Sequence, residues 1–248
     1  MTTEIEIYLN SLSEDILILS LEQRFLTSFP DINRFTSLKE LYCSDNLLSS
    51  LPSNLPQSIE ILHCSGNYLT SLPDLTRFKN LKEIYCSGNY LSSLYLPLTL
   101  EKLYCSGNKL TSLPDLSGFK NLKELDCSNN HLSYLSSLPE SLILLFCLNN
   151  ELTYLPNLPE KTLYLICWNN PLSNILDVNN NSLIKVKQNI KIVNNFRYLY
   201  YCLQFKKQLR KWLWEKVREK YIVEKYHPNY LLENLQENAD LDEFLNNW

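Results

Sequence analysis

The sequence predicts an α/β repeat solenoid, in which short strands from successive coils form one parallel sheet and the return segments are mostly non-helical. Two observations predict it. The stretch LYCSGNKLTSLPDL begins at residue 103 and has close copies that begin near residues 41, 62, 84, 125, 145 and 165. Seven of the eight cysteines hold one fixed position in these copies, at intervals of 19 to 22 residues.

Each copy carries the same residue types at fixed distances from its cysteine, the anchor of the repeat. A leucine or isoleucine stands two positions before the anchor, and an asparagine stands three positions after it. The anchors are Cys43, Cys64, Cys86, Cys105, Cys127, Cys147 and Cys167. The alternation ahead of the asparagine predicts a short strand whose leucine and cysteine point inward. The asparagine is predicted to turn the chain and bond backbone groups, forming a ladder along the stack.

Weaker copies extend the pattern at both ends. Upstream, Leu19 and Leu21 fit, with Arg24 in the position of the asparagine. Downstream, the fitting residues are Leu183, Val186, Gln188 and Val193. The sequence therefore predicts about nine units over residues 16–194, after an N-terminal cap or lead-in over residues 1–15.

The segments that return from one strand to the next are of two types. One reads LPDLTRFKNLKEI and the other, richer in proline, reads LPSNLPQSIEIL. Both are too short and too rich in proline for a full helix, so we expect extended chain or 3₁₀ turns.

The pattern L-x-x-L-x-(L/C)-x-x-N-x-L resembles the leucine-rich-repeat family. The short copies look like the repeats of bacterial effector proteins. The motif CSGNYLTSLPDL and the tail YHPNYLLENL resemble leucine-rich-repeat proteins of giant DNA viruses of amoebae. The resemblance implies a horseshoe with the parallel sheet on its concave side. It also implies a viral-type interaction scaffold in the host cytoplasm.

Composition narrows the class of protein. The formal charge is −4, which does not favour a polyanion as partner of the whole protein. The N-terminus lacks the basic start and apolar core of a signal peptide, and we find no apolar run of about 18 residues. A reducing, cytoplasmic compartment is therefore expected, with free thiols. A straight line of thiols does not suit zinc, so no metal or cofactor is expected.

The residues beside the anchors are predicted to face outward on the concave side and to bind a partner protein. The candidates are Tyr42, His63, Tyr85, Tyr104, Asp126, Phe146 and Trp168, with acid from Glu40, Glu83 and Glu124. The alternative is that the rings pack sideways between strands as a solubilising ladder. The acid disfavours nucleic acid there. An arrangement of Ser65, His63 and an acid, either Glu40 or Glu83, is conceivable, but a smooth strand face supplies neither a pocket nor an oxyanion hole.

Residues 195–248 are predicted to form a C-terminal helical hairpin. Its first segment is basic and its second is acidic, so the two could pair and cap the solenoid; membrane or nucleic-acid contact are the alternatives. A second function, an effector-like ubiquitin ligase, would need a cysteine nucleophile with a nearby aspartate. Cys202 sits in YYCLQF without an acid. A structural component of a virion stays open as a third possibility.

Overall fold

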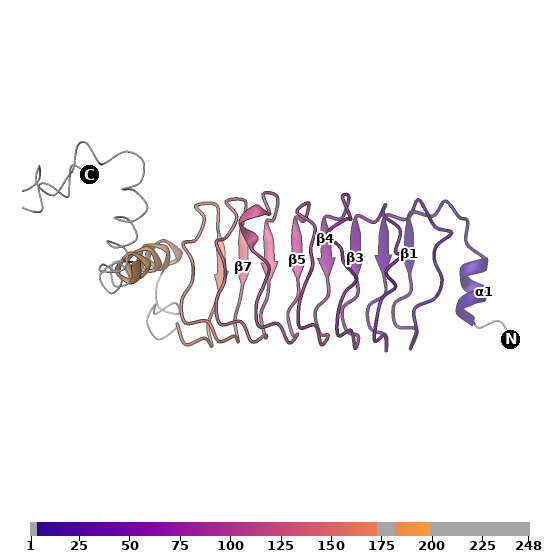
Figure 1. Ribbon diagram of the computed structural model, residues 1–248, viewed down its shortest axis with the longest axis horizontal. Helices are drawn as coiled ribbons and strands as arrows, with labels where there is room; N and C mark the ends of the chain where they lie inside the picture. Colours follow the sequence, from indigo (N-terminus) through magenta and orange to yellow (C-terminus); the bar gives the residue numbers. More distant parts are fainter. Residues whose placement is uncertain (1–3, 173–181, 199–248) are drawn as a thin grey trace, which may run out of the picture. The chain divides into compact units, whose positions relative to one another are not determined.

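The computed structural model describes residues 4–172 and 182–198, and the chain divides into two compact units, residues 1–194 and 195–248. In the first unit, eight strands form one parallel sheet in chain order, as the sequence predicts (Figure 1). The strands are β1 (Ile18–Ser20), β2 (Glu40–Tyr42), β3 (Ile61–His63), β4 (Glu83–Tyr85), β5 (Lys102–Tyr104), β6 (Glu124–Asp126), β7 (Leu144–Phe146) and β8 (Tyr164–Ile166).

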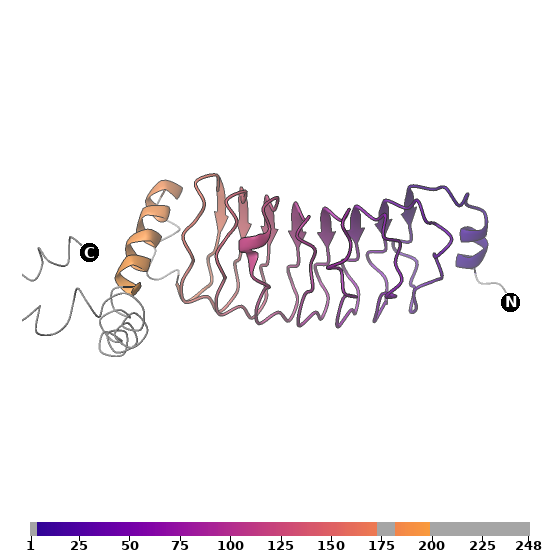
Figure 2. The same ribbon diagram turned by 45° about the horizontal axis from the view of Figure 1, so that its top comes forward.

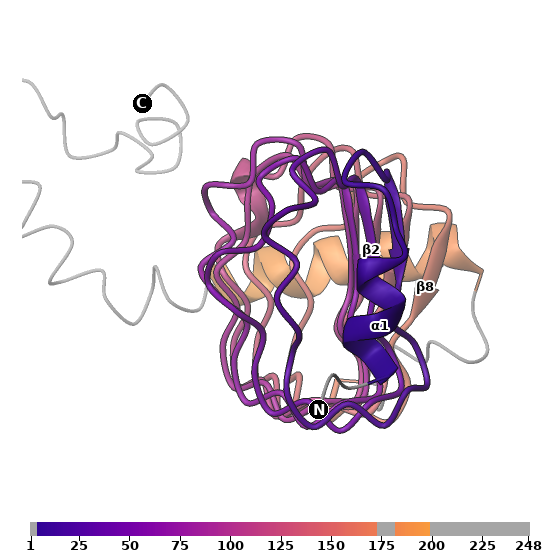
Figure 3. The ribbon, with the colours of Figure 1, turned by 90° about the vertical axis from the view of Figure 1, so that its right-hand side faces the viewer.

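Equivalent residues of successive copies pair in strict register. Leu41 lies opposite Leu19 on one side and Leu62 on the other. In β2 to β7 the middle residue of each strand is buried and both of its neighbours are partly exposed. Seen along the stack, the strands line one side of the coils and the return segments line the opposite side (Figure 3). The core therefore lies between the sheet and the return segments.

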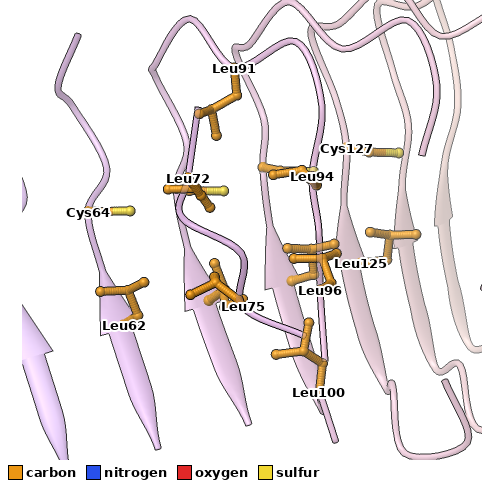
Figure 4. Close-up of a cluster of buried hydrophobic side chains, with 14 of the residues drawn as sticks. Leu62, Cys64, Leu72, Leu75, Leu91, Leu94, Leu96, Leu100, Leu125 and Cys127 are labelled. Carbon is orange, nitrogen blue, oxygen red and sulfur yellow. The ribbon is translucent and has the colours of Figure 1, made fainter. Parts of the chain in front are cut away.

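The anchor cysteines belong to this core. All seven are free thiols with no exposed surface, packed among the leucines of their own and neighbouring coils. Figure 4 shows the side chains of Cys64 and Cys127 in the same cluster as Leu72 and Leu94. The prediction that cysteine acts as a small apolar residue is confirmed. Burial raises the pKa of the Cys43 and Cys86 thiols to about 12.

The asparagine ladder is also confirmed. The Asn108 Nδ2 donates to the carbonyl oxygens of Cys86, in the preceding coil, and of Cys105, in its own coil, both at 3.0 Å. Its Oδ1 accepts the backbone N–H of Leu91 at 2.9 Å. Each buried amide thus forms hydrogen bonds with backbone groups of two coils at once. Without it, the turn would leave these groups unpaired.

The turn needs an unusual backbone conformation two residues after each anchor. There φ lies between 53° and 64°, at Asp45, Gly66, Gly88, Gly107, Asn129, Asn149 and Asn169. Glycine, asparagine and aspartate adopt this left-handed conformation at the lowest cost. Three of the four glycines in the chain therefore stand at this position.

The two types of return segment fit together across neighbouring coils. The longer type buries a phenylalanine, as at Phe78, whose N–H donates to Leu75 at 3.0 Å. The next, proline-rich return supplies Thr99, whose hydroxyl donates to the Leu81 carbonyl at 2.6 Å. The described returns hold one 3₁₀ turn, η1 (Leu116–Gly118), visible in Figure 2. The mostly non-helical returns are as predicted.

Helix α1 (Glu4–Asn10) covers the first coil. Its Leu9 is buried in the core, and the Arg34 guanidinium donates to the carbonyl oxygens of Leu9 and Leu12. The weak upstream copy is a true coil, because Leu19 and Leu21 are fully buried. Its backbone N–H groups at positions 24 and 26 donate to the amide oxygen of Asn46, both at 3.0 Å.

The weak downstream copy, however, is not a ninth strand. Residues 183–198 are helical, with Val186 and Ile190 buried. Asn194 Nδ2 donates to the Leu155 carbonyl at 3.0 Å. The apolar residues here recur every three or four positions, which is the spacing of a helix face, and no asparagine-based turn interrupts them. The predicted C-terminal hairpin lies outside the described residues beyond position 198.

Asn108→Ala is expected to lower the free energy of unfolding by about 1–3 kcal/mol, because it leaves buried backbone groups of two coils unpaired. Urea denaturation measures it. The exposed Asn121 is the control, and Asn121→Ala should change stability by less than about 0.5 kcal/mol. Equal effects of the two substitutions would contradict a structural role of the ladder.

The seven anchor thiols are expected not to react with a thiol reagent in the native protein at pH 9, where an exposed thiol is largely thiolate. After denaturation all should react, with mass spectrometry identifying each modified cysteine. Ser133→Cys places a thiol at an exposed position and is the reactive control. If any anchor thiol reacted as fast as the control thiol, the reagent would have access to the core, which would contradict the burial of the anchors.

Candidate functional site

The outward side of the sheet is here termed the sheet face. It carries the side chains that stand three positions before, one position before and one position after each anchor. All ten predicted residues lie on it and are at least partly exposed: Tyr42, His63, Tyr85, Tyr104, Asp126, Phe146, Trp168, Glu40, Glu83 and Glu124. The strict register aligns them in rows across the strands. That they bind a partner stays a prediction.

The rings one position before the anchors form a continuous column on β2 to β5. The ring centroids of Tyr42 and His63 are 4.6 Å apart, those of His63 and Tyr85 are 3.9 Å apart, and those of Tyr85 and Tyr104 are 5.0 Å apart. The strand spacing sets these distances, because equivalent residues of parallel strands stand about 4.8 Å apart. The rings do pack sideways, as the alternative interpretation of the sequence requires.

Carboxylates fix the outer ends of this ring column. The Tyr42 hydroxyl donates to Glu40 at 2.7 Å, whereas the Tyr104 hydroxyl donates across to Glu124 on the next strand. The hydrogen bond to Glu40, together with burial, raises the pKa of Tyr42 to about 12. Burial and then the bond to Glu124 raise the pKa of Tyr104 to about 12. The rings are thereby held in one orientation.

His63 is a ring of this column rather than a catalytic base. Tyr42 and Tyr85 lie against its two sides, and partial burial lowers its pKa. In the described part of the chain no hydrogen bond joins it to Ser65 or Glu40. A nucleophile and its base need to be within hydrogen-bond reach, so the conceivable Ser–His–acid arrangement is not assembled.

The sheet face becomes apolar over β7 and β8. Six side chains make up this apolar end: Leu144, Phe146, Leu148, Tyr164, Ile166 and Trp168. Tyr164 is 62% exposed and Trp168 is 48% exposed. The sequence interpretation did not include Leu144 and Tyr164. The signal was their position three residues before the anchor, where the coils of β2, β4, β5 and β6 carry glutamate or lysine.

The sheet face is acidic over the remaining coils. It carries the carboxylates Glu22, Glu40, Glu83, Glu124 and Asp126. Lys102 is the one ammonium among these described rows, and it pairs with Glu83 at 3.2 Å.

In a neighbouring row, four positions before the anchors, the glutamates are paired with lysines. Lys39 and Lys82 both pair with Glu60, at 2.9 and 2.7 Å, and Lys123 pairs with Glu101 at 2.7 Å. The hydrogen bonds from Lys82 and Lys39 lower the pKa of Glu60 to about 2. The unbalanced acid therefore belongs to the sheet face and not to this row.

A second exposed row was missed by sequence reasoning. Four positions after the anchors, Tyr68 and Tyr90 stack at 6.0 Å, and the Lys109 ammonium lies 4.6 Å from the Tyr90 ring centroid. Farther along, His131 Nδ1 is 3.3 Å from Glu151. The signal was present in the sequence as a column of aromatic and charged residues just after five of the seven asparagines.

Residues 4–172 and 182–198 offer neither a membrane span nor a metal cluster. No helix of this part is both long and apolar enough to cross a membrane. No group of three or more histidine, cysteine, aspartate or glutamate side chains there could hold a metal ion.

Comparison with known proteins shows what the repeat is similar to. A family model described as leucine-rich repeats, in two copies, matches residues 57–97 and 99–140. YopM from Yersinia enterocolitica is 32% identical, over 64% of this chain and 39% of that chain, with a TM-score of 0.53. A Shigella effector leucine-rich-repeat domain is 29% identical, over 67% of this chain and 73% of that chain, with a TM-score of 0.57. No curated protein matches the chain.

The raised pKa values of Tyr42 and Tyr104 predict alkaline sensitivity. A group whose pKa is raised by folding stabilises the native state fully below its unfolded pKa, near 10, and loses that contribution as the pH rises through 12. Urea denaturation between pH 9 and pH 12 should therefore show a shallower loss of stability for the variant with Tyr42→Phe and Tyr104→Phe.

Tyr95→Phe is the control for this experiment, because Tyr95 is 62% exposed and lies outside the sheet face. It should follow the wild-type profile. Identical profiles for wild type and double variant would mean that the two phenols are not held by their carboxylates.

Proposed function

We propose that this leucine-rich-repeat protein is a non-enzymatic binding module that holds a partner protein on its sheet face. The observation that carries the proposal is the continuity of that face, from the ordered ring column on β2 to β5 to the exposed apolar end on β7 and β8. Extended surfaces of this kind are what stacked repeats use to bind macromolecules.

The size and order of the sheet face favour a protein as its ligand. Eight parallel strands span roughly 35 Å, far more than a small molecule covers. Tyrosine and tryptophan provide large contact areas with few rotatable bonds. Because the Tyr42 and Tyr104 rings are already fixed by carboxylates, little further ordering is lost on binding.

Sideways ring packing alone does not account for the apolar end. A solubilising ladder explains the stacked rings of β2 to β5 through contacts within the protein. Tyr164 and Trp168 are about half exposed and take part in no ring stack among the described residues. Contiguous exposed apolar side chains mark interaction surfaces.

The ligase alternative has less support. It requires a nucleophilic thiolate, and all seven anchor thiols are buried. Burial raises the pKa of thiols such as Cys64 and Cys105, whereas the neighbouring Cys147 thiol lowers the pKa of Cys167. Cys202 lies outside the described residues. The resemblance to repeat proteins of giant DNA viruses of amoebae, a place in the host cytoplasm and a structural role in a virion stay predictions. A virion component would bind through the same face.

The variant with Tyr164→Ala and Trp168→Ala is expected to lose at least about tenfold in partner capture from a host-cell lysate, as hot-spot aromatics do. Its free energy of unfolding should change by less than about 0.5 kcal/mol, because neither ring is packed in the core. Affinity purification with quantitative mass spectrometry measures the first effect, and urea denaturation the second.

Tyr95→Ala with Tyr134→Ala is the matched control. These two rings are 62% and 45% exposed, close to the 62% and 48% of Tyr164 and Trp168, but they lie outside the sheet face. The control should capture as the wild type does. Equal capture by the two double variants would remove the sheet face from the proposal.

A further inference from the structure

Strand β6 is chemically unlike the other strands of the sheet. Its outward positions are Glu124 and Asp126, and Ser128 continues the same alternation two residues beyond the end of the strand. These three residues are termed the acidic strip. On one side lies Tyr104, the last ring of the stacked column, and on the other side lies Phe146, the first ring of the apolar end.

The charge of the acidic strip is not balanced within the described protein. Lys102, in the same row as Glu124 on the adjacent strand, pairs with Glu83 instead, at 3.2 Å. Glu124 accepts from the neutral Tyr104 hydroxyl, and Asp126 accepts from the backbone N–H of Ser128 at 3.0 Å. The two carboxylates of this strand thus accept hydrogen bonds from neutral donors, and neither forms an ion pair with a cation among the described residues.

Ser128 adds a second, independent feature. It is 2% exposed, and its hydroxyl is the one buried side-chain oxygen or nitrogen among the described residues without a hydrogen-bond partner. Leaving such a buried group unpaired destabilises the folded state. The backbone N–H of the same residue donates to the Asp126 carboxylate, which ties Ser128 to the acidic side chain beside it.

We propose that the acidic strip binds an arginine side chain of the partner protein, and that apolar residues beside this arginine pack on the apolar end. The inference rests on the proposed function and adds the chemistry of the partner. A guanidinium has five N–H donors in a planar fork, which two carboxylates and a hydroxyl can accept. Its flat faces suit the rings of Tyr104 and Phe146 on either side.

Other ligands fit the acidic strip less well. Nucleic acid and an anionic membrane surface carry the same sign of charge as Glu124 and Asp126. A metal ion would need more ligands, and the described residues hold no cluster of three metal-binding side chains. The exposed apolar end beside the strip favours a ligand that also carries apolar groups, and a bare cation has none.

Two fluorescent peptides of equal length test the proposal. In the first, arginine alternates with leucine; in the second, glutamate replaces each arginine. Fluorescence anisotropy should show binding of the first peptide to the full chain, weakened by salt, and no binding of the second. Failure of the arginine peptide to bind the wild-type protein would overturn the proposal.

The variant with Glu124→Gln and Asp126→Asn keeps the shape and hydrogen bonds of the strip but removes its charge. It should weaken binding of the arginine peptide by at least about tenfold. Glu140→Gln, at an exposed carboxylate outside the sheet face, should bind as the wild type does. Equal losses in the two proteins would mean attraction to the overall negative charge and would refute a defined site.

Ser128→Ala separates binding from structure. Since the hydroxyl has no partner in the free protein, its removal should leave stability unchanged or raise it, while the arginine peptide binds several-fold more weakly. Unchanged binding would exclude the hydroxyl from the site.

The two proposals fail differently. If Tyr164→Ala with Trp168→Ala abolishes partner capture but Glu124→Gln with Asp126→Asn leaves it intact, the sheet face binds its partner without this arginine.

Discussion

The buried asparagine side chain is the interaction on which the fold depends. Short coils leave backbone groups at each turn that no helix or long strand can pair, and burying them unpaired is costly. One amide, as at Asn67, bonds the carbonyls of Cys43 and Cys64 and accepts the N–H of Leu48. These bonds fix the offset between successive coils. Residues at the remaining repeated positions therefore also lie opposite their equivalents in the next coil.

Because equivalent residues of successive coils align strictly, the repeat in the sequence places equivalent side chains in rows on the surface. A residue type kept at one position becomes a column, as with the rings of His63 and Tyr85. A change of residue type becomes a boundary at a known strand, as where Asp126 follows Tyr104. Each coil can therefore carry a different part of a binding surface without disturbing the core behind it.

The fold and the rows could be predicted because period and position are properties of the sequence. Which neighbouring side chain each residue of a row bonds could not be predicted in this way. Tyr104 bonds Glu124 of the next strand, because its own strand carries Lys102 where others carry glutamate. Residues 183–193 satisfied a loose repeat pattern and a helical one equally well, and burial of Val186 and Ile190 in the core decided for the helix. Neither outcome follows from spacing alone.

The ladder also has a direction. The N–H of Leu48 is paired by an amide from the following coil, Asn67, and the N–H of Leu110 likewise by Asn130. A coil emerging from the ribosome thus stays incomplete until its successor has been synthesised. Growth from the N-terminus always leaves an unfinished edge at the newest coil, so the nascent chain consolidates one repeat behind translation.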